Sequence, residues 1–167
     1  MPIPTPYSAV SPFIQSDIGE ALDLFQSAYK NMDVPADEYA WFTRDLEGSL
    51  DPAQHYRLTF FKIEHDNKII AIAAIGKSGF MRGSWELRWG TTRPAFQRQG
   101  LMSLLTDYRI AYAREHSPNI PGIIHICARS PNLYLKKGFR HIYTRGPKNK
   151  AHYLVKYIHQ DWQDNPA

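Results

Sequence analysis

The sequence contains a single cysteine, Cys127, among 167 residues, so no disulfide can form within the chain. A lone cysteine is typical of proteins in reducing compartments, and we expect a cytoplasmic location. No hydrophobic run approaches the roughly 18 apolar residues of a membrane span. The longest run, residues 69–75, has the length of a strand. Because the opening residues also lack the basic and apolar segments of a secretory signal, we expect no association with a membrane.

The charge of the chain is only mildly unbalanced. Lys and Arg number 20 and Asp and Glu number 16, which gives a net charge of +4. Such a charge favours anionic partners, and both nucleic acid and a small polyanionic cofactor fit that description. The basic residues are spread along the chain, without the basic runs interleaved with aromatic residues that mark nucleic-acid surfaces. The sequence therefore argues against nucleic acid, and a solvated cationic surface is the simplest interpretation.

Hydrophobic periodicity predicts an alternation of helices and strands. The helical segments are residues 18–30, 38–47, a helix that begins after Gly100, and a short helix within 130–139; the strand-like segments are 55–65, 68–76, 85–92, 123–128, 140–145 and 151–159. This order predicts an α/β (α+β) fold with a mixed, mostly antiparallel sheet of six to seven strands and about four helices. We find no repeat or linker, so we expect one domain over 1–167, with a proline-rich arm (1–12) and a polar tail (160–167).

The turn before the central helix carries a recognisable motif. Gln97, Gly100 and Met102 follow the third strand of a predicted meander, and Pro94 precedes them. Downstream, the segment LYLKKGF begins at Leu133. In this order, the two motifs resemble the GNAT superfamily of acyl-CoA-dependent N-acyltransferases, whose signature is Gln/Arg-x-x-Gly-x-Gly/Ala. Met102 departs from that signature, because the family prefers a very small residue there.

The resemblance implies that the glycine turn binds the pyrophosphate of acetyl-CoA. Backbone N–H groups at the start of a helix attract anions, and a glycine lets the backbone approach a ligand closely. The expected cofactor-binding residues are Thr92, Gln97, Arg98, Gln99, Gly100, Leu101, Met102 and Asn132. Arg93 and Arg98 are candidates for charge-assisted phosphate contacts. We expect no metal.

Two residues are the catalytic candidates that the resemblance implies. Tyr134, in the LY motif, would protonate the departing thiolate, although a phenol packed beside Phe139 in the core is the alternative. Glu86 lies eleven residues before Gln97, where some lysine-acetylating members carry a catalytic base. It is also two residues from Arg88 on one strand, so a simple salt bridge is an equal alternative. His125 is a second candidate base, for which a hydrogen-bonded core position is the favoured interpretation. A backbone N–H between residues 90 and 92 would polarise the carbonyl.

Residues outside these motifs suggest where an acceptor amine binds. Acidic and aromatic side chains in and after the loop between the first two helices suit a cationic amine, and capping of the second helix is the alternative role for the acids; they are Asp33, Asp37, Glu38, Tyr39 and Trp41. Trp85 and Trp89 are expected to share one strand face, which is more typical of a core than of a substrate pocket. Cys127 occupies a position where many family members have an asparagine, and a small buried thiol is the expected state.

Together these features predict a cytoplasmic N-acetyltransferase that transfers an acetyl group directly from acetyl-CoA to a primary amine in a ternary complex. The acceptor is either a small molecule or a protein, and a homodimer is left open. The main alternative is a catalytically silent module of the same fold that binds acyl-CoA as a sensor. The two differ in turnover, because a sensor binds acyl-CoA without releasing CoA.

Overall fold

The structure is a computed structural model that describes residues 9–32, 34–79, 83–117, 122–146 and 150–159. The elements in these ranges, in chain order, are β1 (Ser11–Pro12), α1 (Ile18–Tyr29), α2 (Ala36–Leu50), β2 (Leu58–His65), β3 (Lys68–Lys77), β4 (Trp85–Thr92), α3 (Leu101–Glu115), β5 (Ile123–Ala128), α4 (Asn132–Lys136), β6 (Arg140–Arg145) and β7 (Ala151–Tyr157), with short 3-10 turns at Gln15–Asp17 and Pro94–Phe96. The mixed α/β fold expected from the sequence is confirmed, and α2 extends beyond its predicted bounds at both ends.

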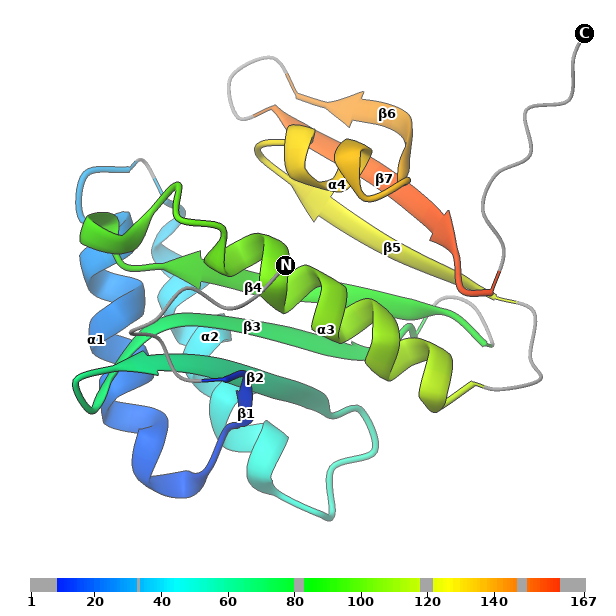
Figure 1. The fold of residues 1–167 in the computed structure, drawn as a ribbon. Coiled ribbons are helices and arrows are strands. Elements are labelled where there is room, and N and C mark those ends of the chain that lie inside the picture. Colours follow the sequence, from blue (N-terminus) through cyan, green and yellow to red (C-terminus); the bar gives the residue numbers. More distant parts are fainter. Residues whose placement is uncertain (1–8, 33, 80–82, 118–121, 147–149, 160–167) are drawn as a thin grey trace, which may run out of the picture.

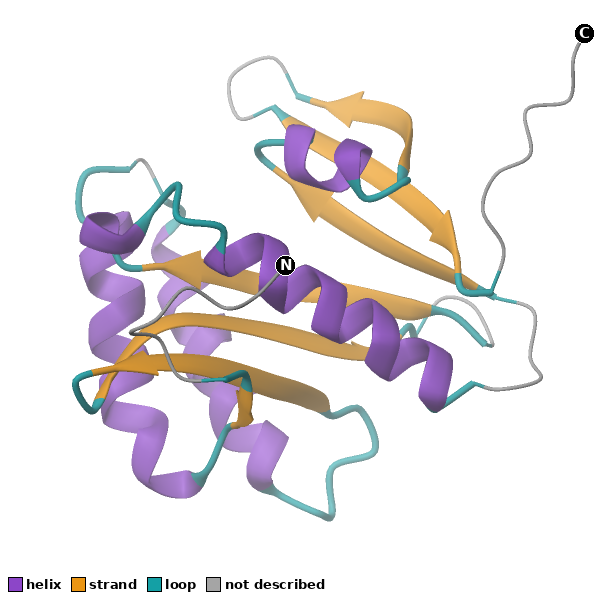
Figure 2. Cartoon of the chain, viewed as in Figure 1, coloured by secondary structure: helices purple, strands orange, loops and turns teal. Residues whose placement is uncertain are grey.

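The strands form one sheet in the order β1-β2-β3-β4-β5-β7-β6. Every neighbouring pair is antiparallel except β4 and β5, which run parallel. Figure 1 shows α3 and α4 in front of the sheet and α1 and α2 behind β2–β4. Figure 2 shows the same layers as helices on either side of one band of strands. No helix in the described ranges is long and apolar enough to cross a membrane.

Each face of the sheet has its own apolar core. One core joins alternate residues of β2–β5 to the buried side of α3, including Ile63, Leu87 and Leu105. The other joins the intervening strand residues to α1 and α2, including Ile72, Phe25 and Phe42. This division follows from the two-residue period of strands and the apolar stripes of the helices. Because both faces of β3 are buried, its sequence is an almost continuous hydrophobic run.

The end of the predicted N-terminal arm belongs to the sheet. Ser11 and Pro12 pair with Lys62 and Phe61 of β2, so the arm does not extend through residue 12 as expected. The Phe13 amide continues this pairing by donating to the Phe60 carbonyl, with an N···O distance of 3.1 Å. The first eight residues and the predicted tail (160–167) lie outside the described ranges.

A β-bulge in β4 separates two tryptophans that alternation would place on one face. Ala74 pairs with Arg88 and Ile72 with Thr91, so β4 uses one more residue than β3, and Trp89 has a φ of 54°. Trp85 lies on the α3 face, where its indole N–H donates to Ser117 at 2.9 Å. Trp89 lies on the opposite face and donates to Asp45 at 2.8 Å. The expectation that they share a face is therefore wrong, because an extra residue inverts the alternation after it.

Candidate active site

The candidate site lies where the parallel pair β4–β5 opens. The two strands pair at only three positions, from Trp85 with Ile124 to Leu87 with Ile126. Beyond these positions, residues 90–92 of β4 and 127–128 of β5 have no partner in each other's strand. We call this region the β4–β5 opening. Unpaired backbone at such a place leaves N–H and C=O groups available to a ligand.

The turn that carries the predicted cofactor motif leads from the opening into α3. Gly100 is the N-cap of α3 with a φ of 84°, and Arg98 also has a left-handed φ of 62°. Among the described residues no side chain caps the helix, so its first amides lack the partner that a cap would supply. Successive backbone amides in such a turn form a concave nest for anions. Residues 97–100 are all exposed, so this nest faces solvent.

The side chains around the turn point in different directions. The side-chain amide of Gln97 donates to the Thr92 carbonyl at 3.5 Å, and that of Gln99 donates to the Ala95 carbonyl at 3.3 Å. Leu101 is buried in the core. The Met102 side chain is directed towards β4, because a Cβ at position 90 would lie 3.0 Å from its sulfur. Met102 therefore points away from the exposed turn and towards Gly90 at the β4–β5 opening.

Arg93 is held by α1 instead of facing the turn. Its guanidinium donates to Glu20 and Asp23 at 2.8 Å each, and its Nε donates to the Ile69 carbonyl at 2.7 Å. These three contacts satisfy the side chain, which is 16% exposed. The expected phosphate contact from Arg93 is therefore not supported, and Arg98 is the basic residue that stays at the turn.

Tyr134 packs in the core, as one of the two alternatives had it, and its hydroxyl points to the β4–β5 opening. Its ring packs edge-on against Phe139 with centroids 5.7 Å apart, and the residue is 7% exposed. Its hydroxyl oxygen would lie 3.8 Å from a Cβ at position 90, so the polar end reaches the β4–β5 opening. Core packing of the ring fixes where the hydroxyl points. Asn132, at the start of α4, is exposed.

A fully buried arginine lies behind Tyr134. Arg109 of α3 is 0% exposed and donates to the carbonyls of Ala74 (3.0 Å) and Arg88 (3.4 Å) at the β4 bulge. Its guanidinium also interacts with the Tyr134 side chain, which favours the charged form, although burial lowers the pKa of Arg109 overall. The sequence analysis missed this residue. Its signal was the spacing of Leu101, Leu105 and Arg109, which places a charged residue on the buried face of α3.

Glu86 takes part in a polar cluster on the face covered by α2. Its carboxylate accepts a hydrogen bond from the Tyr56 hydroxyl at 3.0 Å and lies 3.8 Å from Nε of Arg88. The expected salt bridge with Arg88 is thus present. It does not enclose the carboxylate, whose side chain is 24% exposed.

His125 pairs with Glu86 across the parallel strands, and the two side chains therefore lie on the same face. Burial lowers the pKa of His125, while the charge of Glu86 opposes that shift. Its Nε2 is buried and has no hydrogen-bond partner among the described residues. The expected hydrogen-bonded core histidine is therefore not what the structure has, and an imidazole that stays neutral with an unused nitrogen is suited to accept a proton.

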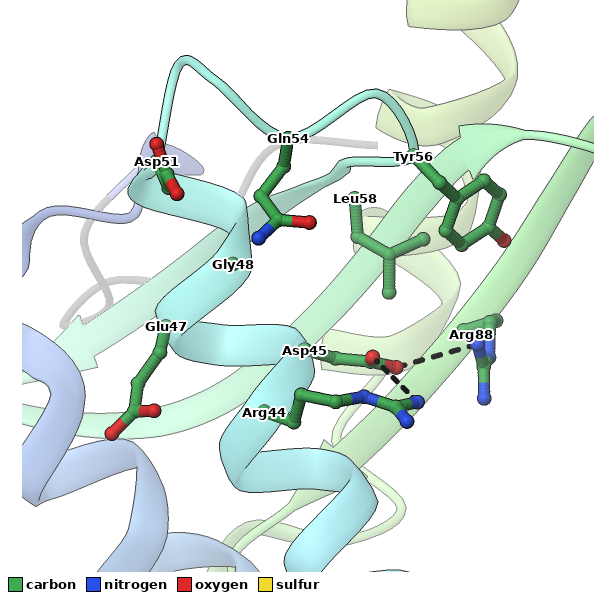
Figure 3. A pocket seen from close by; sticks show the side chains of 9 residues that line it. All are labelled: Arg44, Asp45, Glu47, Gly48, Asp51, Gln54, Tyr56, Leu58 and Arg88. Carbon is green, nitrogen blue, oxygen red and sulfur yellow. Dashed lines mark hydrogen bonds and ion pairs between the residues drawn. The ribbon is translucent and has the colours of Figure 1, made fainter.

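A cavity of about 420 Å³ adjoins this cluster, and Figure 3 shows its walls. It is lined by Arg44, Asp45, Glu47, Gly48, Asp51, Gln54, Tyr56, Leu58 and Arg88. Asp45 is the centre of its polar wall, where Arg44 and Arg88 approach it at 3.4 and 3.3 Å. Because Tyr56 and Arg88 also contact Glu86, the cavity and the candidate base share a wall.

The predicted acceptor residues are only partly brought together. Glu38 forms an ion pair with Arg129, just after β5, at 3.7 Å, and the Arg129 guanidinium lies 5.9 Å from the Tyr29 ring centroid. These contacts join α1 and α2 to the far side of the β4–β5 opening. Tyr39 and Trp41 are exposed at 38% and 44%. Asp37 is exposed, and Asp33 lies outside the described residues.

Cys127 differs from its expected state. It lies at the opening and is exposed, instead of buried. It interacts with Tyr153 of the neighbouring β7, and this contact is the largest cause of a raised pKa at the tyrosine. Cys127 shares a strand face with His125, two residues earlier, and α1 and α2 cover that face behind β2–β4 (Figure 1).

Comparison with known proteins gives a consistent result. The model of the acetyltransferase (GNAT) family matches residues 20–139, which include β4, the glycine turn, α3 and Tyr134. No curated protein matches the sequence. Many solved structures share the fold, as the following three illustrate.

A GNAT-family chain from Desulfovibrio desulfuricans has a TM-score of 0.71 at 15% identity, covering 90% of this chain and 98% of its own. The ribosomal-protein-S18-alanine N-acetyltransferase of Escherichia coli has a TM-score of 0.66 at 17% identity, with coverage of 96% and 99%. PaiA N-acetyltransferase from Thermoplasma acidophilum, solved with coenzyme A, has a TM-score of 0.64 at 12% identity, with coverage of 90% and 98%. At these identities the likeness concerns the fold.

Proposed function

We propose that this chain, which belongs to the GNAT acetyltransferase family, transfers an acetyl group from acetyl-CoA to a primary amine. The transfer is direct, in a ternary complex, and the acceptor is a small molecule or a protein. One observation carries the proposal: an exposed amide turn at the start of α3 leads out of the β4–β5 opening, which the Tyr134 hydroxyl reaches. A cytoplasmic site of action remains our expectation from the lone cysteine.

The residues at the opening fit the cofactor in chemical terms. The turn at Arg98 and Gly100 suits a pyrophosphate, since it combines backbone amides, a helix N-terminus and one cationic side chain. The solved neighbours that contain coenzyme A are consistent with this assignment. Residues 90–92 have no partner in β5, so those of their backbone N–H groups that face the β5 side are candidate donors to the thioester carbonyl oxygen.

The reaction requires a balanced movement of protons. The amine nitrogen forms a bond to the acyl carbon as the carbon–sulfur bond breaks, and the nitrogen loses one proton. Tyr134 gives its hydroxyl proton to the sulfur, so that CoA leaves with a neutral thiol instead of a thiolate. The proton from the amine passes to a base and, through solvent, restores the tyrosine.

Two neighbouring groups are suited to act as the base. Glu86 is partly exposed and bound by Tyr56, and His125 beside it has a lowered pKa and an unused nitrogen. Since both side chains lie on the α2 face, we place the acceptor amine on that face. The cavity beside Glu86 and the Glu38–Arg129 pair then lie on the acceptor side.

The cofactor site is tested by isothermal titration with acetyl-CoA of the wild type and of Gly100→Trp and Gly100→Ala. Both variants carry the strain of a side chain at a φ of 84°, and neither Cβ meets another atom, because nothing lies within 4 Å of a Cβ there. Only tryptophan is large enough to block the turn. We expect binding by the wild type and by Gly100→Ala, and its loss in Gly100→Trp. Equal loss in both variants, or no binding by the wild type, contradicts the proposal.

Turnover separates an enzyme from a sensor. A panel of primary amines is screened for CoA release with a thiol reagent, using Cys127→Ser protein because the exposed thiol would itself react. Release that depends on an amine supports the enzyme. Tight acetyl-CoA binding with no release for any amine supports the silent module.

A further inference from the structure

We propose that Arg109 is a positioning residue for the transfer reaction, holding the Tyr134 hydroxyl so that its proton points into the β4–β5 opening. This inference rests on the proposed function, because it concerns how the proposed proton donor is oriented. It assigns a role to a side chain that lies entirely inside the protein.

Arg109 has an unusual set of neighbours for a buried cation. No carboxylate pairs with it in the described part of the chain; its guanidinium donates to backbone carbonyls and to the Thr106 hydroxyl at 3.2 Å. Its Nη2 also lies 4.0 Å from the sulfur of Met102. Burying a guanidinium without a counter-ion is costly, so an arginine here calls for a compensating role.

The arrangement brings Arg109, Met102 and Tyr134 to one place behind Gly90. A Cβ at position 90 would contact both the Met102 sulfur and the Tyr134 hydroxyl, at 3.0 and 3.8 Å. Arg109 approaches the same sulfur and interacts with Tyr134. Because Arg109 is fully buried and Gly90 is exposed, we infer that the guanidinium lies on the inner side of the hydroxyl and the opening on its outer side.

The chemistry of arginine makes this geometry directional. A guanidinium has only N–H donors, so towards the tyrosine oxygen it can only donate, and it cannot accept the hydroxyl proton. That proton must point elsewhere, and the space beside Gly90 is where the thioester sulfur is proposed to bind. After the proton moves to sulfur, the phenolate left on Tyr134 faces a fixed positive charge in a poorly hydrated site.

A double-mutant cycle tests this coupling, with kcat and KM for acetyl-CoA measured for the wild type, Tyr134→Phe, Arg109→Met and the double variant. Removing a general acid costs on the order of 100-fold in kcat, so we expect such a loss in Tyr134→Phe. We expect Arg109→Met to lose about 30-fold or more when Tyr134 is present and less than about threefold in the Tyr134→Phe background. KM for acetyl-CoA should change little in all four proteins.

Arg109→Lys and Arg109→Gln serve as matched variants and remain informative if Arg109→Met does not fold. Lysine is also cationic and only donates, so kcat should recover to within about tenfold of the wild type. Glutamine is neutral and can either donate or accept, so it supplies no charge beside the phenolate and does not fix the direction of the hydroxyl proton; it should behave like methionine. Circular dichroism and the thermal midpoint of each variant define an assay temperature at which all are folded.

The outcomes distinguish this inference from the proposed function. If Arg109→Met loses the same factor in the wild-type and Tyr134→Phe backgrounds, the arginine is only structural and the inference is wrong. A Tyr134→Phe variant with wild-type kcat shows that Tyr134 is not the proton donor and overturns the inference, while the acetyl transfer itself stands. Recovery by lysine together with a non-additive cycle supports the positioning role, because a loss of packing alone does not depend on Tyr134.

Discussion

The two halves of the sheet differ in how much of them other elements cover. In β3, eight of ten residues are buried, because α3 packs on one face and α1 and α2 on the other. In β6, at the far edge, all six residues are exposed. The proposed site lies between them, where β4 parts from β5. The densely packed half thus holds the turn, Arg109 and the bulge, while the thinly covered half supplies Tyr134 and Cys127.

The largest expected difference between the two halves is in how much a substitution lowers the free energy of unfolding. Ile72→Ala removes a side chain that is 0% exposed between β3 and the helices α1 and α2, and we expect a loss of about 2–5 kcal/mol in the free energy of unfolding. Ile142→Ala in β6 removes a side chain that is 56% exposed and should cost less than about 0.5 kcal/mol. Urea denaturation measures both. Similar losses would mean that the two halves are equally packed.

A second prediction concerns the closed end of the β4–β5 pair. A Cβ at Gly122 would lie 2.0 Å from the carbonyl oxygen of Gly83, which is backbone and cannot rotate away. We expect Gly122→Ala to cost about 1–3 kcal/mol by forcing the strand ends apart.

Gly19→Ala is the matched control for this substitution, since it lies in α1 with nothing within 4 Å. It should be neutral or stabilising by up to about 1 kcal/mol, because alanine favours a helix. Thermal unfolding compares the two variants. A Gly122→Ala protein as stable as Gly19→Ala would show that the backbone at Gly83 and Gly122 moves apart at little cost in free energy.

The smallest expected effect is the pH dependence from His125, at the boundary of the two halves. Burial lowers its pKa in the folded protein below the usual value of about 6.5. As the pH falls through 6.5, the unfolded chain therefore binds a proton before the folded one. The free energy of unfolding then falls as the pH falls. Above that pH the histidine contributes nothing to the slope.

His125→Gln should flatten the dependence of the free energy of unfolding on pH below 6.5, as followed by urea titrations between about pH 5 and 8. A slope that is unchanged in the variant would assign the effect to other groups. If His125 is also the base in the reaction, the same variant should lose the acidic limb of the pH profile of kcat/KM, whereas Glu86→Gln should retain it.

Much of the fold was readable from local patterns. The sheet-forming runs, the helix after Gly100 and the short helix containing Tyr134 follow from periodicities of two and 3.6 residues, which are properties of neighbouring residues. The left-handed turn at Gly100 was likewise signalled by a glycine directly before an amphipathic helix.

Other features of the site depend on long-range contacts. A bulge that places Trp89 opposite Trp85 depends on how β3 and β4 pair, and single-sequence alternation contains no such information. Arg93 is directed to α1 by Glu20 and Asp23, which lie 73 and 70 positions away in the chain. The exposure of Cys127 depends on which strands α1 and α2 cover (Figure 1).

Local sequence was enough to place the elements and the turn, since backbone preferences and side-chain periodicity act over a few residues. Packing between segments that are far apart in the sequence determines which side chains meet at the β4–β5 opening. Arg109 illustrates the difference: its spacing from Leu101 and Leu105 placed it on the buried face of α3, but its contacts with the bulge carbonyls and with Tyr134 arise only when the strands and α4 pack around it. Burial and partner choice are properties of the assembled chain, because they depend on residues far apart in sequence.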